Sequence, residues 1–291
     1  MTQFSGIWVP LVTPFAADGA VDLAALRRLA QELSRHVHGL VVCGSTGEAL
    51  ALDDAEQLAA LDAVLDAVPG FPVVMGLGGP YLPRLHARLA ALRGRPLAGL
   101  LVPPPYYVRP SQAAIATYFR DLADRAACPL IAYNVPYRTG VAMEFATFET
   151  IARHPNIQAV KDCGGDPALT LDLLTGTPLQ VLAGEDGNLL TTLCAGGSGA
   201  IAASAHLYPE QFAAVYRAVK EQQLDRARSG FMRLWPLIRL LFAEPNPAGV
   251  KAALALRGLA DARVRAPMTP ASPDLRARLA ALLERMDAEA P

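Results

Sequence analysis

The stretches LIAY (residues 130–133) and IQAVK (residues 157–161) decide the fold class of this chain. Each is a short run of apolar residues that ends in a reactive polar side chain, Tyr133 or Lys161. The runs do not alternate between apolar and polar residues, which is typical of parallel strands buried on both faces. They therefore predict two strands of a parallel sheet.

Six further short apolar runs lie before and after these two. The starts of all eight runs are roughly 20 to 35 residues apart, which is the repeat expected of β-loop-α-loop units. The first run is followed by residues 13–15 (Thr-Pro-Phe), which lack the glycine-rich turn of a dinucleotide-binding sheet. The pattern predicts an α/β fold, a closed (β/α)₈ TIM barrel. The six runs are Gly6–Val12, Leu40–Cys43, Pro72–Met75, Gly99–Val102, Leu179–Ala183 and Ala200–Ala203.

Helix signals separate the predicted strands. Asp22 is a predicted N-cap for a run through Val37, and Asp53 with Glu56 forms a capping box before residues 57–68. Ser111 is expected to open a helix that ends near Ala127, and Pro209 suits the first position of a helix over 211–221.

After about Gln222 the strand signals stop. Three helices are predicted there, over Arg226–Phe242, Pro247–Gly258 and Ser272–Asp287, with the turn EPNP (residues 244–247) between the first two. The chain is therefore expected to form a catalytic barrel domain over 1–222 and a C-terminal α-helical subdomain over 223–291.

The composition excludes several classes of function. The chain has 291 residues, of which 52% are hydrophobic and 18% charged, and its net charge is −1. It has no basic stripe for nucleic acid, no apolar run of about 18 residues for a membrane, and no signal-peptide pattern at its start. Its four cysteines and five histidines show no metal-ligand spacing. These features predict a cytoplasmic protein without a metal and with scattered, reduced thiols.

In a (β/α)₈ barrel the active site forms at the carboxyl ends of the strands, so polar residues there are candidates. Lys161 closes a predicted strand. A lysine taken out of water loses basicity, because burial penalises the ammonium form, and the neutral amine is the form that attacks a ketone. Lys161 is thus a candidate Schiff-base nucleophile. The alternative is an interior lysine that pairs with a carboxylate such as Asp162 or Glu185.

Tyr133 ends the preceding strand, where a phenol can exchange protons with a Schiff base if hydroxyls relay them to solvent. Ser45 and Thr46, in GSTGE (residues 44–48), could supply that relay. However, Ser45 and Glu48 also have the spacing of a capping box, and a helix that began there would offer free N–H groups to a substrate carboxylate.

Other polar residues follow the strands with less specific signals. Tyr106 and Tyr107 come after the fourth strand, where a tyrosine more often serves packing. Arg138 lies five residues past Tyr133, where its guanidinium could bind a carboxylate with two hydrogen bonds or simply be solvated. Residues 76–79 (GLGG) follow the third strand and would allow a ligand close to the backbone. Residues 196–199 (GGSG) precede a strand, which indicates a tight turn.

The combination of Lys161, Tyr133, Arg138 and GSTGE resembles the dihydrodipicolinate synthase / N-acetylneuraminate lyase family of class I aldolases. The resemblance runs from GIWVPLVTPF (6–15) to PMTP (267–270), and so covers nearly the whole chain. Its most specific parts are GLVVCGSTGEA (39–49), YNVP (133–136) and AVKDC (159–163).

The resemblance implies a barrel with a C-terminal helical domain, assembled as a homotetramer, and small-molecule substrates. It implies that pyruvate condenses with Lys161 without a cofactor, and that Tyr133 is the acid and base. Ser45 and Tyr107 would complete the proton relay, with Tyr107 reaching in from a neighbouring subunit. Thr46 would hold the pyruvate carboxylate, and the backbones of Gly184 and Ile201 would line the site.

The match to individual members is mixed. Arg138-Thr139-Gly140 is similar to dihydrodipicolinate synthase, in which the arginine binds the carboxylate of aspartate semialdehyde. Val108 and Ser45 depart from the synthase, which usually has asparagine and threonine there. The synthase reaction is the leading hypothesis. The alternatives are an aldolase or dehydratase of another 2-oxo acid (sialic acid, a 2-keto-3-deoxy sugar acid or a hydroxy-oxoglutarate) and a non-catalytic paralogue that binds an oxo acid.

The resemblance also bears on regulation. Family members that lysine inhibits carry polar and charged groups at the effector site. Arg84 stands where a carboxylate would bind the lysine ammonium and should repel it. No feedback inhibition by lysine is expected. The positions that match the effector site are Ala49, Leu50, Asp54, Pro80 and Arg84.

Overall fold

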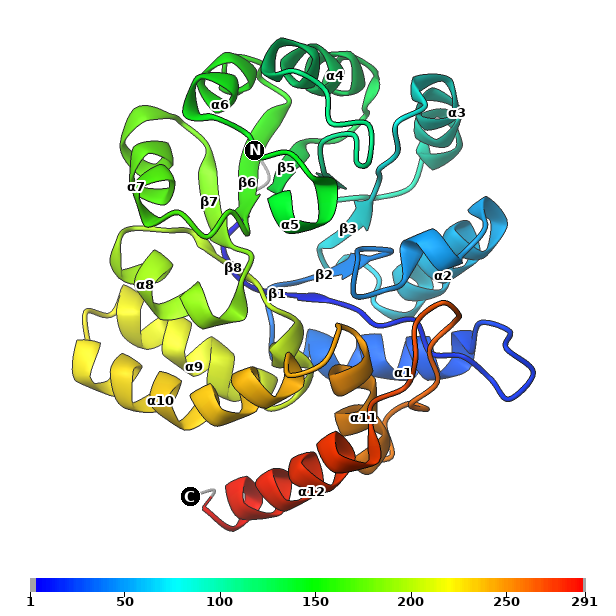
Figure 1. The fold of residues 1–291 in the computed structure, drawn as a ribbon, viewed down its shortest axis with the longest axis vertical. Coiled ribbons are helices and arrows are strands. Elements are labelled where there is room, and N and C mark those ends of the chain that lie inside the picture. Colours follow the sequence, from blue (N-terminus) through cyan, green and yellow to red (C-terminus); the bar gives the residue numbers. More distant parts are fainter. Residues whose placement is uncertain (1–3, 290–291) are drawn as a thin grey trace. The chain divides into compact units, whose positions relative to one another are not determined.

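The structure is a computed structural model that describes residues 4–289. Its eight strands are parallel and form a closed barrel in chain order, which confirms the predicted fold class (Figure 1). All eight coincide with the predicted runs to within two residues at either end. The strands are β1 (Gly6–Pro10), β2 (Gly39–Val42), β3 (Val73–Gly76), β4 (Gly99–Val102), β5 (Leu130–Asn134), β6 (Ile157–Asp162), β7 (Gln180–Ala183) and β8 (Gly199–Ile201).

The strands are buried on both faces, as their continuous apolar sequences require. Strand β5, for example, is fully buried along its length, and β4 likewise. Strands β5 and β6 run one residue further than predicted, because Asn134 pairs with Asp162 beyond the pair of Tyr133 and Lys161. The added pair is held by a hydrogen bond of 3.0 Å from Asn134 Nδ2 to Asp162 Oδ1.

The chain divides into two compact units, Met1–Gly6 with Pro72–Ile201 and Ile7–Phe71 with Ala202–Pro291. The first unit contains β3 to β8, and its longer helices lie outside these strands, whereas α5 directly follows the end of β5 (Figure 1). Ser111 caps α4 by accepting from the N–H of Ala114, as predicted. The helices of this unit are α3 (Leu82–Leu92), α4 (Gln112–Arg125), α5 (Pro136–Thr139), α6 (Phe145–Ala152), α7 (Pro167–Gly176), η2 (Asp186–Asn188) and α8 (Leu189–Cys194).

The second unit contains most of β1, all of β2 and the C-terminal part of the chain. Asp22 caps α1, and Asp53 and Glu56 form the predicted capping box at the start of α2. Pro209 occupies the first turn of α9, as predicted. The helices are α1 (Leu23–Ser34), η1 (Ala49–Ala51), α2 (Asp54–Ala67), η3 (Ala203–His206), α9 (Pro209–Lys220), α10 (Leu224–Leu241), α11 (Ala248–Leu256) and α12 (Pro273–Ala288).

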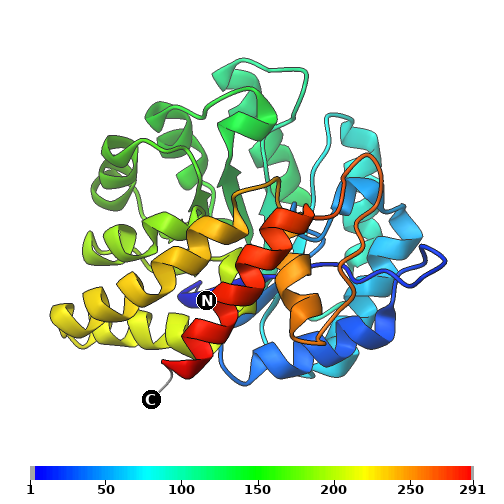
Figure 2. The same ribbon diagram turned by 60° about the horizontal axis from the view of Figure 1, so that its bottom comes forward.

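The C-terminal helices α10, α11 and α12 correspond to the three that the sequence predicts. Helix α9 lies beside α10, and α12 lies beside α10 and α11 (Figures 1 and 2). The boundary between a barrel domain over 1–222 and a helical subdomain over 223–291 stays a prediction, and residues 1–3 and 290–291 of those domains lie outside the described residues. Within 4–289, no helix has both the length and the apolarity needed to cross a bilayer.

Candidate active site

Lys161 and Tyr133 lie side by side at the carboxyl ends of β6 and β5. The strand register pairs these two residues directly. Lys161 Nζ is 4.5 Å from the centroid of the Tyr133 ring. Both side chains are buried, with exposed fractions of 7% and 5%. The parallel register therefore brings a buried amine and a phenol together, as the position of both residues at strand ends predicts.

The two carboxylates that could have neutralised Lys161 have other partners. Glu185 accepts a hydrogen bond of 2.9 Å from the hydroxyl of Tyr137. Asp162 accepts from three donors, which are the Asn134 amide (3.0 Å), the Thr170 hydroxyl (2.8 Å) and the Gly164 N–H (2.9 Å). Among residues 4–6 and 72–201, which the structure describes in this unit, no carboxylate forms an ion pair with Lys161. The alternative of a lysine paired with Asp162 or Glu185 is therefore wrong.

Cys163 and Gly184 shape the space beside Tyr133. Cys163 Sγ lies 4.0 Å from Tyr133 Oη, and burial raises the pKa of the thiol to about 12, so it stays protonated at neutral pH. The N–H of Gly184 donates to Asp162 O at 2.8 Å. A Cβ at Gly184 would lie 2.3 Å from Cys163 Sγ, so only glycine fits this close approach. Ile201 ends β8 with 1% of its surface exposed.

Arg138 lies on α5, directly after β5. Its side chain is exposed, and its guanidinium carbon lies 5.6 Å from the centroid of the Tyr137 ring. Arg138 forms no ion pair with the described residues of its unit. Its fork of N–H donors is therefore available to a carboxylate ligand.

Tyr107 lies in the segment after β4, with a backbone φ of 71°. Its N–H donates to Thr139 O at 3.3 Å, and the Nε of Arg109 donates to Gly140 O at 2.8 Å. These bonds connect the segment to the C-terminal end of α5, the helix that carries Arg138. The side chain of Tyr107 is 91% exposed, so packing within this chain does not explain why a tyrosine occupies this position.

Ser45 and Thr46 belong to the second unit and lie in a turn after β2. Glu48 has a left-handed backbone (φ 53°), and neither its side chain nor that of Ser45 caps a helix. Only the short η1 follows, and the next α-helix begins at Asp54. The capping box predicted for Ser45 and Glu48 is therefore wrong, because the carboxylate of Glu48 has partners elsewhere in the unit.

The turn offers donors to a ligand. Neither the N–H of Ser45 nor that of Thr46 has an acceptor within the described part of the chain. Adjacent N–H groups in a turn form a concavity that suits an anion. Thr46 has 4% of its surface exposed, and its Oγ1 accepts a hydrogen bond of 2.9 Å from Asn246 Nδ2.

Three residues that the sequence reasoning missed hold the turn from the C-terminal region. They are Asn246, Lys251 and Arg265. Lys251, with no exposed side-chain surface, forms an ion pair with Glu48 and donates to Arg263 O at 2.7 Å. The N–H of Arg265 donates to the other oxygen of Glu48 at 2.9 Å. The EPNP turn contains Asn246, but a turn motif alone does not predict a long-range partner.

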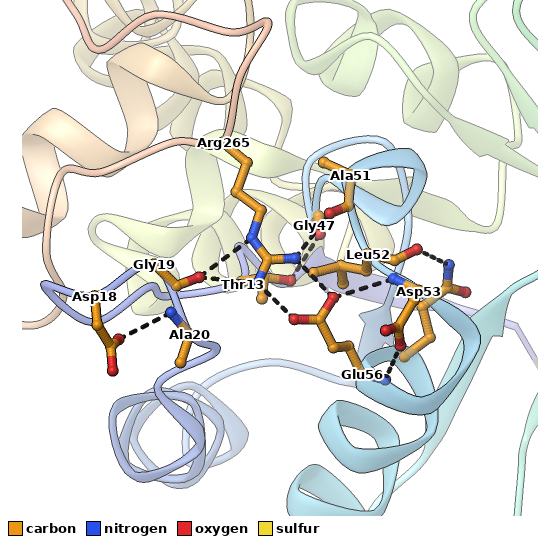
Figure 3. Close-up of polar contacts among 11 residues, drawn as sticks. Thr13, Asp18, Gly19, Ala20, Gly47, Ala51, Leu52, Asp53, Glu56 and Arg265 are labelled. Carbon is orange, nitrogen blue, oxygen red and sulfur yellow. Dashed lines mark hydrogen bonds and ion pairs between the residues drawn. The ribbon is translucent and has the colours of Figure 1, made fainter.

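The side chain of Arg265 joins three segments of the second unit (Figure 3). Its guanidinium donates to Gly19 O at 2.9 Å, to Ala51 O at 2.8 Å and to the carboxylate of Glu56 at 2.5 and 2.7 Å. Glu56 also completes the capping box with Asp53. These contacts with Arg265 lower the pKa of Glu56, so the carboxylate stays ionised at neutral pH.

The two glycine-rich runs have different environments. Gly199 begins β8, and a Cβ there would lie 2.0 Å from Gly6 O, so it serves close strand packing. Gly79, after β3, has a φ of 157°, and its carbonyl accepts from the hydroxyl of Tyr118.

Within residues 4–289, no three His, Cys, Asp or Glu side chains are grouped so that they could hold a metal ion.

Comparisons with known proteins agree on one family. Residues 3–286 match the dihydrodipicolinate synthetase family. The chain is 37% identical to 4-hydroxy-tetrahydrodipicolinate synthase of Haloarcula marismortui, over 99% of this chain and 95% of the relative.

Solved structures of the same family have the same fold. The 4-hydroxy-tetrahydrodipicolinate synthase of Methylacidiphilum fumariolicum SolV superposes with a TM-score of 0.95 at 28% identity, over 99% of this chain and 97% of the other. A monomeric dihydrodipicolinate synthase variant superposes with a TM-score of 0.94 at 30% identity, over 98% of each chain.

A (β/α)₈ barrel with a buried lysine beside a tyrosine at its strand ends is typical of the class I aldolases, and this chain is a pyruvate-dependent lyase of that class. It belongs to the dihydrodipicolinate synthetase family.

Proposed function

We propose that the chain condenses pyruvate with L-aspartate 4-semialdehyde through a Schiff base on Lys161. The observation that carries this proposal is the buried amine of Lys161, which has no carboxylate partner in its unit and lies 4.5 Å from the ring of Tyr133. A buried lysine amine at a strand end, with a phenol beside it, is placed as the nucleophile that forms a Schiff base with a ketone requires. The names of the relatives support the choice of reaction.

In the proposed mechanism, Lys161 Nζ attacks the keto carbon of pyruvate, and water leaves as the imine forms. The imine withdraws electrons from the methyl carbon, which loses a proton and becomes a nucleophilic enamine. Tyr133 supplies and accepts the protons of these steps. The enamine attacks the aldehyde carbon of the semialdehyde, and the amino group of the semialdehyde then displaces Lys161 Nζ. Because the imine is the electron sink, the reaction needs no metal or organic cofactor.

The other predicted residues take the roles that the family resemblance implies. Thr46 holds the pyruvate carboxylate, supported by its hydroxyl and the free N–H groups of its turn. Ser45 and Tyr107 relay protons between Tyr133 and solvent. The backbones of Gly184 and Ile201 line the site, which is supported by the close approach of Gly184 to Cys163 and by the burial of Ile201.

Arg138 is proposed to bind the carboxylate of the semialdehyde, supported by its exposed guanidinium without an ion-pair partner. The test is an assay in which pyruvate is offered with a panel of aldehydes, and consumption of pyruvate is followed. Aspartate semialdehyde should be the preferred partner. If it is inert and another aldehyde reacts, the synthase reaction is overturned.

A second candidate is an aldolase or dehydratase of another 2-oxo acid. It is favoured by Ser45, which lacks the methyl group of the usual threonine, and by Val108, which is 57% exposed where the synthase usually has asparagine. The same assay run in the cleavage direction, with sialic acid, a 2-keto-3-deoxy sugar acid and a hydroxy-oxoglutarate, distinguishes the two candidates. Release of pyruvate from one of these acids would support the second.

We further propose that lysine does not inhibit the enzyme. Arg84, whose cation would repel the lysine ammonium, and the apolar Ala49, Leu50 and Pro80 support this, and Leu50 is 79% exposed. Activity should be unchanged in the presence of millimolar lysine. A several-fold loss of activity under these conditions would refute the proposal.

The exposed ring of Tyr107 supports a homotetramer in which this residue completes the site of a neighbouring subunit. A monomeric variant also exists among the solved relatives. Sedimentation velocity at assay concentrations should give a tetramer. A fully active monomer would exclude the proposed role of Tyr107 across an interface. The proposed location is the cytoplasm, which is supported by four cysteines that are all free thiols.

A further inference from the structure

The amide of Asn246 is directed at a residue of the proposed substrate site. Asn246 lies in the turn between α10 and α11, 200 residues away from Thr46 in the sequence. Its Nδ2 donates a hydrogen bond of 2.9 Å to Thr46 Oγ1. The turn after β2 is thus in contact with the C-terminal region through the hydroxyl that is proposed to hold the pyruvate carboxylate.

This hydrogen bond determines what the Thr46 hydroxyl can offer a ligand. A hydroxyl has one proton to donate and two lone pairs that accept. Because the Asn246 amide donates to Thr46 Oγ1, it occupies a lone pair and leaves the proton free. No described residue accepts that proton. The hydroxyl is therefore oriented as a donor, which is what a carboxylate requires.

The other end of the Asn246 amide supports a specific role. Asn246 Oδ1 is buried and has no donor among the described residues. A buried acceptor without a partner costs about 1–3 kcal/mol. An asparagine that served only to close its own turn would gain by using this oxygen. The side chain instead makes its one hydrogen bond to Thr46.

Both partners are held on fixed backbone. On one side of Thr46, Gly47 O accepts from the Thr13 hydroxyl at 2.7 Å, and Glu48 forms the buried ion pair with Lys251. Lys251 lies in α11, which begins two residues after Asn246. Arg265 then fastens η1 and the start of α2 (Figure 3). These interactions hold the backbone on both sides of the hydrogen bond between Asn246 and Thr46.

We propose that Asn246 is a positioning residue for catalysis. It fixes the Thr46 hydroxyl so that its proton is donated to the carboxylate of pyruvate. The inference rests on the proposed function, since it takes pyruvate as the ligand of Thr46.

The test is a double-mutant cycle with Asn246→Ala and Thr46→Val. In the otherwise native enzyme, Asn246→Ala should raise the KM for pyruvate about tenfold, the loss expected for one hydrogen bond to a charged group. The value of kcat should change less. In the Thr46→Val background, where no hydroxyl remains to be oriented, Asn246→Ala should change the KM less than twofold. An equal effect in both backgrounds would overturn the inference.

The variant Asn246→Asp distinguishes the hydrogen bond donated to Thr46 from the space that the Asn246 side chain fills. Aspartate has nearly the shape of asparagine, but its carboxylate accepts the Thr46 proton instead of donating to Oγ1. The KM for pyruvate should therefore rise at least as much as in Asn246→Ala. Recovery of the native KM by Asn246→Asp would show a purely structural role and refute the inference.

Asn156→Ala is the matched control, because the side-chain amide of Asn156 donates to two backbone carbonyls, Ala123 O and Ala126 O, at 3.0 and 3.2 Å. Its effect on the KM should be less than twofold and equal in both backgrounds. Reduction with borohydride in the presence of pyruvate distinguishes failure of the Schiff-base mechanism from failure of the role proposed for Asn246. A native enzyme that forms no adduct overturns the proposed function and the inference together. A native enzyme that forms the adduct, but whose cycle shows no coupling, overturns the inference alone.

Discussion

Lys161 and Tyr133 are neighbours because β5 and β6 are parallel, and their register pairs the two residues near the carboxyl ends of both strands. In a strand, successive side chains point to opposite faces, so the pair Tyr133–Lys161 and the pair Asn134–Asp162 face opposite ways. The second pair is joined by its own hydrogen bond. This alternation keeps Asp162 away from Lys161 although the two residues are adjacent in the chain.

Strand-end position was enough to predict Lys161, Tyr133 and Arg138 as candidates, because the ends of parallel strands meet on one face. Which charged and polar groups pair with one another in the site was not predictable in the same way. Whether Glu185 pairs with Lys161 depends on Tyr137 of α5, whose hydroxyl donates a hydrogen bond to this carboxylate. Such competition between partners is decided by the tertiary structure.

Arg138→Ala should weaken use of the semialdehyde and spare pyruvate. The guanidinium is proposed to bind only the second substrate, and a lost charge-assisted hydrogen bond pair costs roughly 2–3 kcal/mol. The KM for the semialdehyde should rise by one to two orders of magnitude, measured in steady-state kinetics. Arg153→Ala, which removes another exposed arginine, is the control. If Arg138→Ala lost the trapping of pyruvate by borohydride to the same extent as its use of the semialdehyde, the assigned role would be contradicted.

At the scale of elements, the turn after β2 shows where local sequence rules fail. Ser45 and Glu48 have the spacing of a capping box, yet the carboxylate of Glu48 forms an ion pair with Lys251, which is 203 residues away. The true capping box is at Asp53 and Glu56, where the sequence also predicts it. Both motifs are alike locally, and only the buried ammonium of Lys251 distinguishes them.

Glu48→Gln should destabilise the protein strongly. The change leaves Lys251, which has no exposed side-chain surface, buried without a counter-charge. Breaking such a pair costs about 3–5 kcal/mol of unfolding free energy, whereas replacing both members can be nearly neutral. Glu48→Gln combined with Lys251→Met should therefore recover much of the loss in urea unfolding.

The control for this experiment is Glu32→Gln, which breaks the solvent-exposed ion pair between Glu32 and Arg35. Its cost should stay below about 1 kcal/mol. If Glu48→Gln proves as mild as Glu32→Gln, the Glu48–Lys251 pair does not hold the turn.

At the scale of the whole molecule, the strand repeat predicted the barrel and the order of its strands, since each βα unit is a local pattern. The links between distant parts were not predictable. His206, after β8, shows why. Its Nε2 accepts from the N–H of Val12 at 3.2 Å, and its Nδ1 donates to Ala203 O at 2.8 Å. A lone histidine in a sequence carries no sign of such partners.

The burial of His206 should make stability depend on pH. Burial lowers its pKa from 6.5 to about 4, so the folded state resists a proton that the unfolded state binds. The contribution is complete above pH 6.5 and decreases as the pH falls toward 4, by about 3 kcal/mol at most. His206→Gln should flatten the unfolding free energy over this range, measured in urea. An unchanged slope in His206→Gln would mean that His206 is not the responsible group.

The central claim is that Lys161 is the residue that binds pyruvate covalently. The sequence has lysine only at positions 161, 220 and 251, so an adduct is easily assigned. The native enzyme, reduced with borohydride in the presence of pyruvate, should gain the mass of one reduced adduct in the intact chain. Peptide mapping should place this adduct on Lys161. Lys220→Ala, which removes an exposed lysine, should behave like the native enzyme, and Lys161→Ala should remain unmodified. A native enzyme without an adduct, or an adduct that persists in Lys161→Ala, would contradict the account.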